Sequence, residues 1–156
     1  MKFETTFAKI IAALIILLFI MWARQGNAGV LRQYNPKLTV EQEQQMEKAI
    51  GEAGKKFNIP ASLIKSIIVV ESSARPRVIS RGGDYGLMQV RWSVHHKDFG
   101  VSKEQLLESQ TNIFIGTEIF ARYYAQKKNV YAALVRYSGG NQSMANKVMN
   151  IWRRLQ

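Results

Sequence analysis

The sequence predicts a mainly α-helical domain of the α+β class, a bundle of helices with at most a small β-hairpin around residues 77–91. Three observations favour this fold class. Apolar residues recur at helical spacing in several segments of the chain. The sequences Thr39–Gln42 and Ser102–Gln105 are capping boxes of the kind that starts a helix. A glycine-rich stretch between residues 78 and 90 interrupts the helical pattern with turns or short strands.

Length and composition favour one globular domain. The chain has 156 residues, of which 47% are hydrophobic and 21% charged, as in ordinary folded proteins. The absence of cysteine excludes disulfides, thiolate nucleophiles and cysteine-ligated zinc. The formal net charge of +11 favours polyanionic partners such as nucleic acid, anionic lipid or an acidic cell-wall polymer.

The N-terminus predicts export. Lys2 and Lys9 precede an apolar run of 14 residues, Ile10–Ala23, which is short for a spanning helix. Small residues at Gly26–Ala28 suit cleavage after Ala28, so residues 1–28 are interpreted as a signal peptide. An uncleaved signal anchor is the alternative. Residues 29–38 are interpreted as a linker and residues 39–156 as the folded domain.

The first two predicted helices surround a break at residues 58–60. The first begins at Thr39 and carries an apolar face that ends with Phe57. The second runs from about Pro60 to Glu71 or Ser72, because proline fits a first helical turn. Arg75-Pro76 ends it, since a residue before proline leaves the helical region.

The second half of the chain predicts three further helices. Residues 91–100 are expected to be irregular and aromatic. Apolar spacing then predicts a helix over about 112–128 and a short one over 131–137. Ser138-Gly139-Gly140 breaks the pattern, and the last helix carries one apolar stripe that ends at Leu155.

Glu71 is the main candidate for chemistry. It follows Ile64, Ile67 and Ile68 by seven, four and three residues, so all four share one helix face. A carboxyl held against apolar side chains keeps its proton near neutral pH, as a general acid must. A surface glutamate that pairs with Arg75 is the structural alternative.

Four blocks in order give the chain a family resemblance. They are Glu71–Pro76 (ESSARP), Gly86–Val90 (GLMQV), Asn112-Ile113 with Gly116, and Tyr137–Gly140 (YSGG). Together they resemble the transglycosylase domain of SLT-type lytic transglycosylases, which belong to the lysozyme-like superfamily. The resemblance implies a helical bundle around a glycan cleft.

The resemblance implies cleavage of peptidoglycan between N-acetylmuramic acid and N-acetylglucosamine. Glu71 would be the single acid and base, and the product a 1,6-anhydro sugar. The other matched positions would bind substrate or shape the cleft: Ser72, Gly86, Met88, Gln89, Tyr137 and Ser138. Ser138 stands where the family has asparagine. Serine can still form a hydrogen bond, but its side chain is shorter, so its contact with the substrate stays open. The Asn112 block is more typical of helix packing than of catalysis.

Asp84 leaves a second mechanism open. The sequence Asp84-Tyr85-Gly86 before an apolar-apolar-Gln run also resembles true lysozymes, where a second carboxylate assists hydrolysis. Asp84 is otherwise a turn residue. A non-catalytic peptidoglycan-binding module is a third possibility, distinguished by the effect of changing Glu71.

The remaining expectations concern location and partners. Export argues against a nucleic-acid partner, and no metal or cofactor is expected, because adjacent His95 and His96 cannot face one ligand together and no HExxH sequence occurs. We expect a periplasmic or envelope location, or anchoring in the inner membrane through residues 1–28. The resemblance extends to wall-opening enzymes of secretion and conjugation systems, whose machinery would then be a partner, and to some bacteriophage lysis proteins.

Overall fold

The computed structural model describes residues 10–15 and 29–156. The chain divides into two compact units, Met1–Val30 and Leu31–Gln156. In the first unit, residues 10–15 are helical. No helix within the described residues combines the length and apolar character needed to cross a bilayer. Most of the predicted signal segment, 1–28, lies outside the described residues, so its cleavage stays a prediction.

The segment 29–38 differs from the irregular linker that the sequence predicts. It contains a helix, α2 (Val30–Tyr34), and a turn that follows it. Leu31 and Leu38 are buried in the main core, which explains why this segment is ordered. Arg32 also forms an ion pair of 2.7 Å with the buried carboxylate of Glu43 on the next helix.

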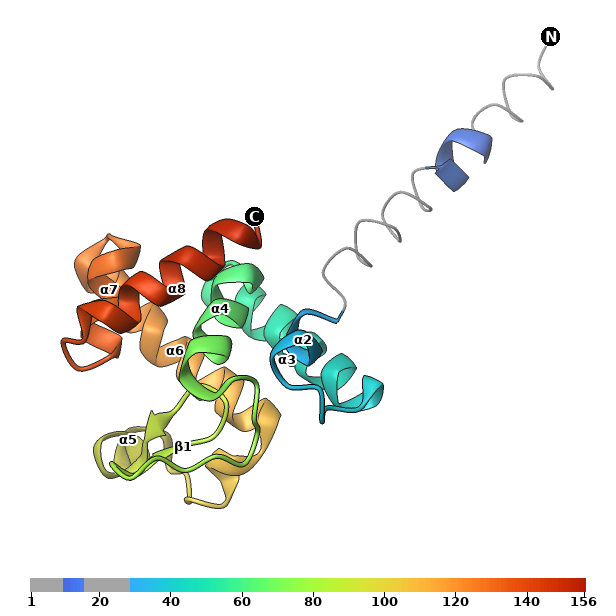
Figure 1. Cartoon of the computed structure of the whole chain (residues 1–156). Helices are drawn as coiled ribbons and strands as arrows, with labels where there is room; N and C mark the ends of the chain where they lie inside the picture. Colours follow the sequence, from blue (N-terminus) through green and yellow to red (C-terminus); the bar gives the residue numbers. More distant parts are fainter. Residues whose placement is uncertain (1–9, 16–28) are drawn as a thin grey trace, which may run out of the picture. The chain divides into compact units, whose positions relative to one another are not determined.

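Two helices carry the first half of the domain. α3 (Val40–Phe57) begins with the predicted capping box at Thr39 and Gln42, and this prediction is confirmed. α4 (Ala61–Ser72) lies in the middle of the domain in Figure 1 and is buried along most of its length. The segment that joins the two helices folds back tightly on α3, because a Cβ on Gly54 would lie 2.8 Å from the carbonyl oxygen of Ile59.

A small antiparallel hairpin follows α4, as predicted. β1 (Asp84–Tyr85) pairs with β2 (Val90–Arg91), with Asp84 opposite Arg91. The expectation of an irregular 91–100 segment is wrong, because α5 (Trp92–Phe99) occupies it. This helix has no buried residue, so it lacks the apolar stripe that periodicity analysis detects. A short 3₁₀ helix, η1 (Gln105–Leu107), comes next.

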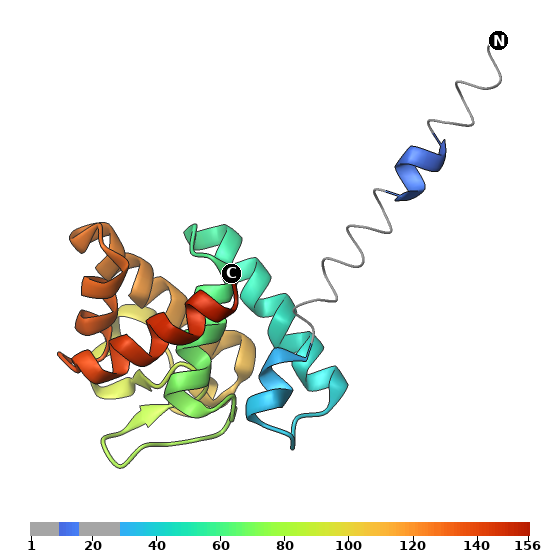
Figure 2. The same cartoon turned by 45° about the horizontal axis from the view of Figure 1, so that its top comes forward.

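Three helices complete the domain: α6 (Ser109–Lys127), α7 (Val130–Tyr137) and α8 (Gln142–Arg154). The side chains of Asn129 and Asn141 cap the last two. α6 packs against α3 and α7, and α8 packs against α4 and α7. Figure 2 shows α8, in red, lying across α4 at the surface of the bundle. The predicted fold class, mainly α with a small hairpin, is confirmed.

The apolar core has two parts. The larger part surrounds α4 and includes residues of α3, α6, α7 and α8. The smaller part joins the hairpin to α6 through Val90, Val101, Leu106 and Ile119. Burial of these groups fixes the hairpin against α6, so the hairpin faces the end of α4 from a rigid support.

Candidate active site

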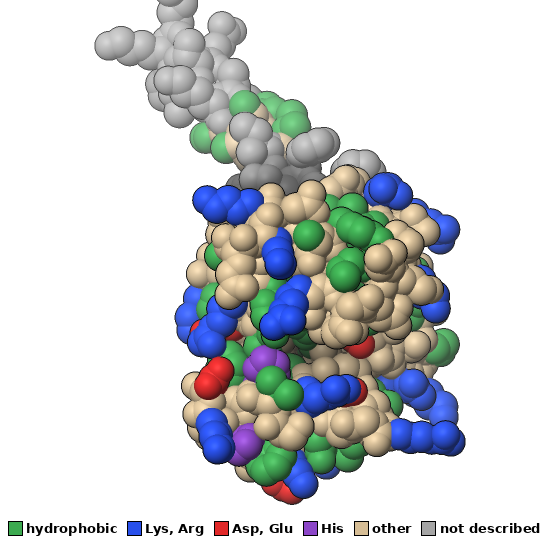
Figure 3. All heavy atoms as spheres, turned by 90° about the vertical axis from the view of Figure 1, so that its left-hand side faces the viewer, with side chains coloured by type: hydrophobic (Ala, Val, Ile, Leu, Met, Phe, Trp, Pro, Cys, Tyr) green, Lys and Arg blue, Asp and Glu red, His purple; other side chains and the backbone are tan. Residues whose placement is uncertain are grey.

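A cleft of about 650 Å³ lies where the end of α4 meets the hairpin. Its walls come from α4, β1, β2, α5, α6, α7 and the start of α8. Its polar and charged lining residues are Glu71, Ser80, Asp84, Gln89, Arg91, His95, Tyr123, Arg136, Tyr137 and Ser138. Figure 3 views the side of the domain on which α5 and α7 lie in Figure 1 and shows basic side chains spread over it, with few acidic ones.

Glu71 stands in the last turn of α4 and lines this cleft. Ser73 and Ala74 then adopt positive φ values of 51° and 55°, which turn the chain sharply away from the helix. Glu71 therefore remains at the cleft wall while the next residue, Ser72, is buried. Among the described residues, no hydrogen bond reaches the Glu71 carboxyl group.

The pKa of Glu71 is strongly raised. Burial raises it most, and the negative charge of Asp84 adds to this effect, so the pKa increases from 4.5 to about 8. A carboxyl with this pKa is mostly neutral at pH 7. It can therefore donate a proton, as the sequence predicts for this residue.

Asp84 lines the same cleft in a very different environment. Arg91 donates two hydrogen bonds to its carboxylate, of 2.7 and 3.0 Å, and the Ser80 hydroxyl donates a third of 2.8 Å. Partial burial favours the neutral acid, but the hydrogen bonds and the charge of Arg91 outweigh it and lower the pKa of Asp84. One cleft thus holds a neutral and an ionised carboxyl group, the division of roles that acid catalysis uses.

Asn112 positions the loop between the strands. Its side-chain oxygen accepts a hydrogen bond of 2.7 Å from the backbone N–H of Met88, and its amide donates to the carbonyls of Tyr85 and Leu106. Gly86, at φ +74°, lies against this amide, because an added Cβ would come within 2.4 Å of Asn112 Nδ2. Asn112 is fully buried, so its role is structural.

Three predicted substrate-binding residues do not line the cleft. Met88 is completely buried, and its side chain packs on α6 so closely that a Cβ on Gly116 would lie 2.6 Å away. Ser72 is buried and donates to the carbonyl of Ile68 within α4. Gly86 is buried against Asn112. The structure assigns these residues to the packing behind the cleft.

The other predicted residues do reach the cleft. The Tyr137 hydroxyl donates a hydrogen bond of 2.7 Å to the carbonyl of Met88, and this bond joins α7 to the loop between the strands. Burial and the nearby Glu71 raise the pKa of Tyr137, so its phenol stays neutral. Gln89 has a positive φ of 49°, and its side-chain amide donates a hydrogen bond of 2.8 Å to the carbonyl of Gly86. Ser138 also lines the cleft.

Sequence reasoning missed Tyr123 and Arg136 as cleft residues, and it placed His95 and His96 only at the surface near the cleft mouth. Tyr123 and Arg136 face the cleft together, with the guanidinium of Arg136 5.5 Å from the centre of the Tyr123 ring. His95 is half-buried in the wall, and burial lowers its pKa. His96 instead stacks on Trp92 at 4.3 Å. These residues lie on three different helices, so no local spacing could have grouped them.

A candidate metal centre is not formed by the described residues, in which no three His, Asp or Glu side chains gather closely enough to hold an ion.

Comparison with known proteins gives a consistent picture. A family model described as the transglycosylase SLT domain matches residues 48–151. Membrane-bound lytic murein transglycosylase E of Buchnera aphidicola is 30% identical over 61% of this chain and 50% of its own length. Endo-type membrane-bound lytic murein transglycosylase A of Klebsiella pneumoniae is 29% identical over 54% and 42%.

Membrane-bound lytic murein transglycosylase C of Edwardsiella ictaluri is 32% identical over 59% of this chain and 30% of its own length. The chain therefore spans half or less of each of these three curated relatives. The match runs from within α3 to within α8, and all the cleft residues described above lie inside it.

Proposed function

Because the chain belongs to the transglycosylase SLT domain family, we propose that it is a peptidoglycan lytic transglycosylase in which Glu71 is both acid and base. The curated relatives are named lytic murein transglycosylases, and murein is peptidoglycan. The observation that carries the proposal is the neutral carboxyl of Glu71 in an open cleft.

In the first step, Glu71 protonates the oxygen that links N-acetylmuramic acid to N-acetylglucosamine. A pKa of about 8 keeps this proton available at pH 7. The glycosidic bond breaks, and the acetamido group of the muramoyl sugar assists at C1. The carboxylate that remains is the base for the second step.

In the second step, Glu71 takes the proton from the C6 hydroxyl as that oxygen bonds to C1. The step is balanced in protons, because the proton from the C6 hydroxyl restores the neutral Glu71 carboxyl group. The product is a 1,6-anhydro sugar, and no water is consumed. Tyr137 supports this geometry by holding the loop between the strands against α7 through its bond to Met88.

A hydrolytic mechanism is the second candidate, and one observation favours it: Asp84 shares the cleft with Glu71. A pair of carboxylates can hydrolyse a glycosidic bond. Both oxygens of Asp84, however, already accept hydrogen bonds from Arg91 or Ser80. These bonds hold Asp84 in place and reduce its nucleophilicity, so we favour Glu71 acting alone.

The cellular setting is a separate proposal, which starts from the apolar N-terminal sequence. We propose that the enzyme acts in the periplasm or envelope, exported or anchored by residues 1–28, and opens the wall for a secretion or conjugation apparatus. Its positive charge suits an acidic wall polymer. A non-catalytic wall-binding module would not require an acid in the cleft, which argues against that alternative.

Digestion of purified peptidoglycan sacculi with analysis of the products by mass spectrometry tests the proposal. The wild-type protein is expected to release 1,6-anhydro products, and Glu71→Gln to bind sacculi without cleaving them. Glu52→Gln, a change at an exposed glutamate of α3, is the matched control. Products that carry oxygen from labelled water would establish hydrolysis instead. Equal cleavage by wild type and Glu71→Gln would remove Glu71 from the mechanism, and binding of sacculi by both proteins with cleavage by neither would leave only the binding module.

A further inference from the structure

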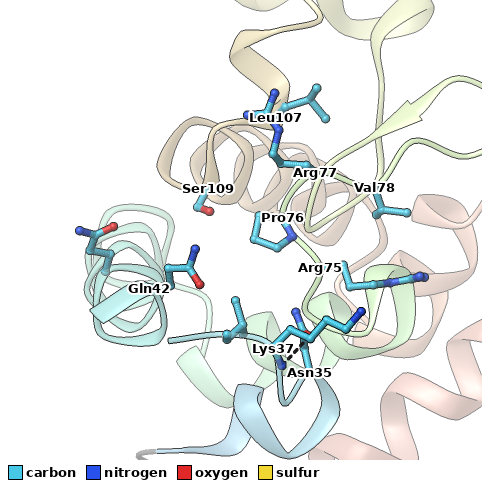
Figure 4. Close-up of a pocket in the computed structure, with 11 residues that line it drawn as sticks. Asn35, Lys37, Gln42, Arg75, Pro76, Arg77, Val78, Leu107 and Ser109 are labelled. Atoms are coloured by element: carbon cyan, nitrogen blue, oxygen red, sulfur yellow. Dashed lines mark hydrogen bonds between the residues drawn. The ribbon is translucent and has the colours of Figure 1, made fainter. Parts of the chain in front are cut away.

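A second cavity, of about 610 Å³, borders the chain segment that follows α4. Arg75–Val78 form one wall, and the turn before α3, the first turns of α3 and the start of α6 form the others (Figure 4). The segment between Glu71 and Ser80 thus contributes to both cavities, since those two residues line the catalytic cleft. The carbonyl of Val78, which lines the second cavity, accepts a hydrogen bond from Gln89, which lines the catalytic cleft, so this bond joins the walls of the two cavities.

The charge of this cavity is entirely positive. Its lining, all within the described domain, includes Lys37, Arg75 and Arg77 and no Asp or Glu. None of the three forms an ion pair with a described carboxylate. Figure 4 shows Lys37 beside Asn35 at one end of the cavity and Arg77 beside Leu107 at the other, while the guanidinium of Arg75 extends away from it. Arg75 instead donates to the carbonyl of Ser72.

Hydrogen-bond donors lie between the two cations. The side-chain oxygen of Gln42 is held by the backbone N–H of Thr39 in the capping box, at 3.0 Å. Its amide NH₂ group has no partner among the described residues and points into the cavity in Figure 4. The hydroxyl of Ser109 lies nearby in the same view. A ligand with acceptor groups along its length therefore meets donors throughout.

The cavity is also preformed. The side-chain amide of Asn35 donates a hydrogen bond of 3.0 Å to the carbonyl of Ala74, and its oxygen accepts one of 3.2 Å from the N–H of Lys37. Leu38 is buried in the main core. These contacts fix the turn that carries Lys37 before any ligand arrives, so little ordering entropy is lost on binding.

We propose that this cavity binds the stem peptide of the peptidoglycan strand whose sugar occupies the cleft, an inference that rests on the proposed function. Two cations at opposite ends fit a short peptide with two separated carboxylates, and Pro76 and Val78 offer apolar contact to its alkyl parts. The peptide is covalently joined to the sugar, so its effective concentration is high and weak contacts suffice. The site thereby selects glycan that still carries peptides.

The test compares one enzyme on two substrates: glycan strands with stem peptides, and the same strands freed of peptides by an amidase. The double change Lys37→Gln with Arg77→Gln removes both cations, which are exposed and outside the cleft. We expect kcat/KM on peptide-bearing glycan to fall about five- to tenfold, through KM, as for two exposed ion pairs. Activity on peptide-free glycan is expected to stay the same. Lys127→Gln with Lys128→Gln, at the exposed end of α6, is the charge-matched control.

A titration that needs no cleavage separates this proposal from the proposed function. A synthetic stem tripeptide of alanine, glutamate and diaminopimelate is added to the Glu71→Gln protein and followed by NMR. Shifts at Asn35, Gln42 and Ser109, which line the cavity and are unchanged in the double variant, support the site if they vanish in that variant. Equal loss on both substrates, no loss on either, or shifts that inorganic phosphate reproduces at the same concentration would overturn it. If the wild type cleaves neither substrate, the proposed activity fails, and the titration alone decides on the cavity.

Discussion

Replacing Glu71 with glutamine should stabilise the folded protein, and the gain should grow with pH. In the folded state the Glu71 carboxyl keeps its proton up to about pH 8, whereas its ordinary pKa is 4.5. Between these values only the unfolded chain releases this proton, which lowers the free energy of unfolding as pH rises. The glutamine variant has no proton to release at this position, so its free energy of unfolding does not fall in this way as the pH rises.

The magnitude follows from the pKa. Each pKa unit corresponds to about 1.4 kcal/mol. Because Glu71 is half-buried, solvent screening reduces the effect, and the full gain in the free energy of unfolding of Glu71→Gln over wild type comes to about 3 to 5 kcal/mol. Below about pH 4.5 the carboxyl is protonated in both states, and the difference between the two proteins should be constant. It should rise through the window up to about pH 8 and then level off.

Urea denaturation followed by tryptophan fluorescence measures this effect at a series of pH values from about 4 to 9. Subtraction of wild type from variant at each pH removes the contributions of titrating groups that do not interact with Glu71. Glu52→Gln, on the exposed side of α3, shows what removal of a surface carboxylate does by itself. A difference for Glu71→Gln that stays flat across this window would show that Glu71 ionises as an exposed glutamate does, and the acid role would fail with it.

Three further predictions concern the cleft and its support. Asp84→Asn should lower the pKa of Glu71, so the alkaline limit of kcat/KM moves to lower pH by about half a unit to one unit; a rate loss above about 100-fold would instead favour hydrolysis. Gly86→Ala should destabilise the fold by about 3 kcal/mol or more in urea denaturation, because its Cβ would meet Asn112 at 2.4 Å; a loss below about 1 kcal/mol would contradict this packing. Tyr137→Phe should cost about 1 to 2 kcal/mol in the same assay, since it leaves a backbone carbonyl without its donor, and unchanged stability would contradict that bond.

Local sequence patterns were sufficient for most of the secondary structure. The capping box at Thr39, the proline before α4 and the apolar spacing of α6 and α7 predicted helices whose ends lie within a few residues of the observed ones. The same reasoning failed for α2 and α5. α2 is only five residues long, and α5 buries no residue, so neither carries a period that a sequence window can detect.

The individual site residues show where sequence reasoning ends. Glu71 could be predicted, because its spacing from three isoleucines places it on the buried face of one helix. The prediction for Met88 could not be corrected from sequence, because its burial depends on Gly116 of a helix that begins 21 residues later. Tyr123 and Arg136 were missed for the same reason, since only packing brings their helices to one cleft.

The amino-acid sequence by itself determined the helical class, the acid at the end of an apolar helix and the order of the four motifs, because each depends on residues close together in the chain. The tertiary structure alone decided which side chains meet. Long-range packing set the opposite pKa shifts of Glu71 and Asp84, placed Met88 and Gly86 behind the cleft, and formed a cationic cavity beside it. These outcomes depend on burial and on charges brought near by folding, and no local pattern contains either.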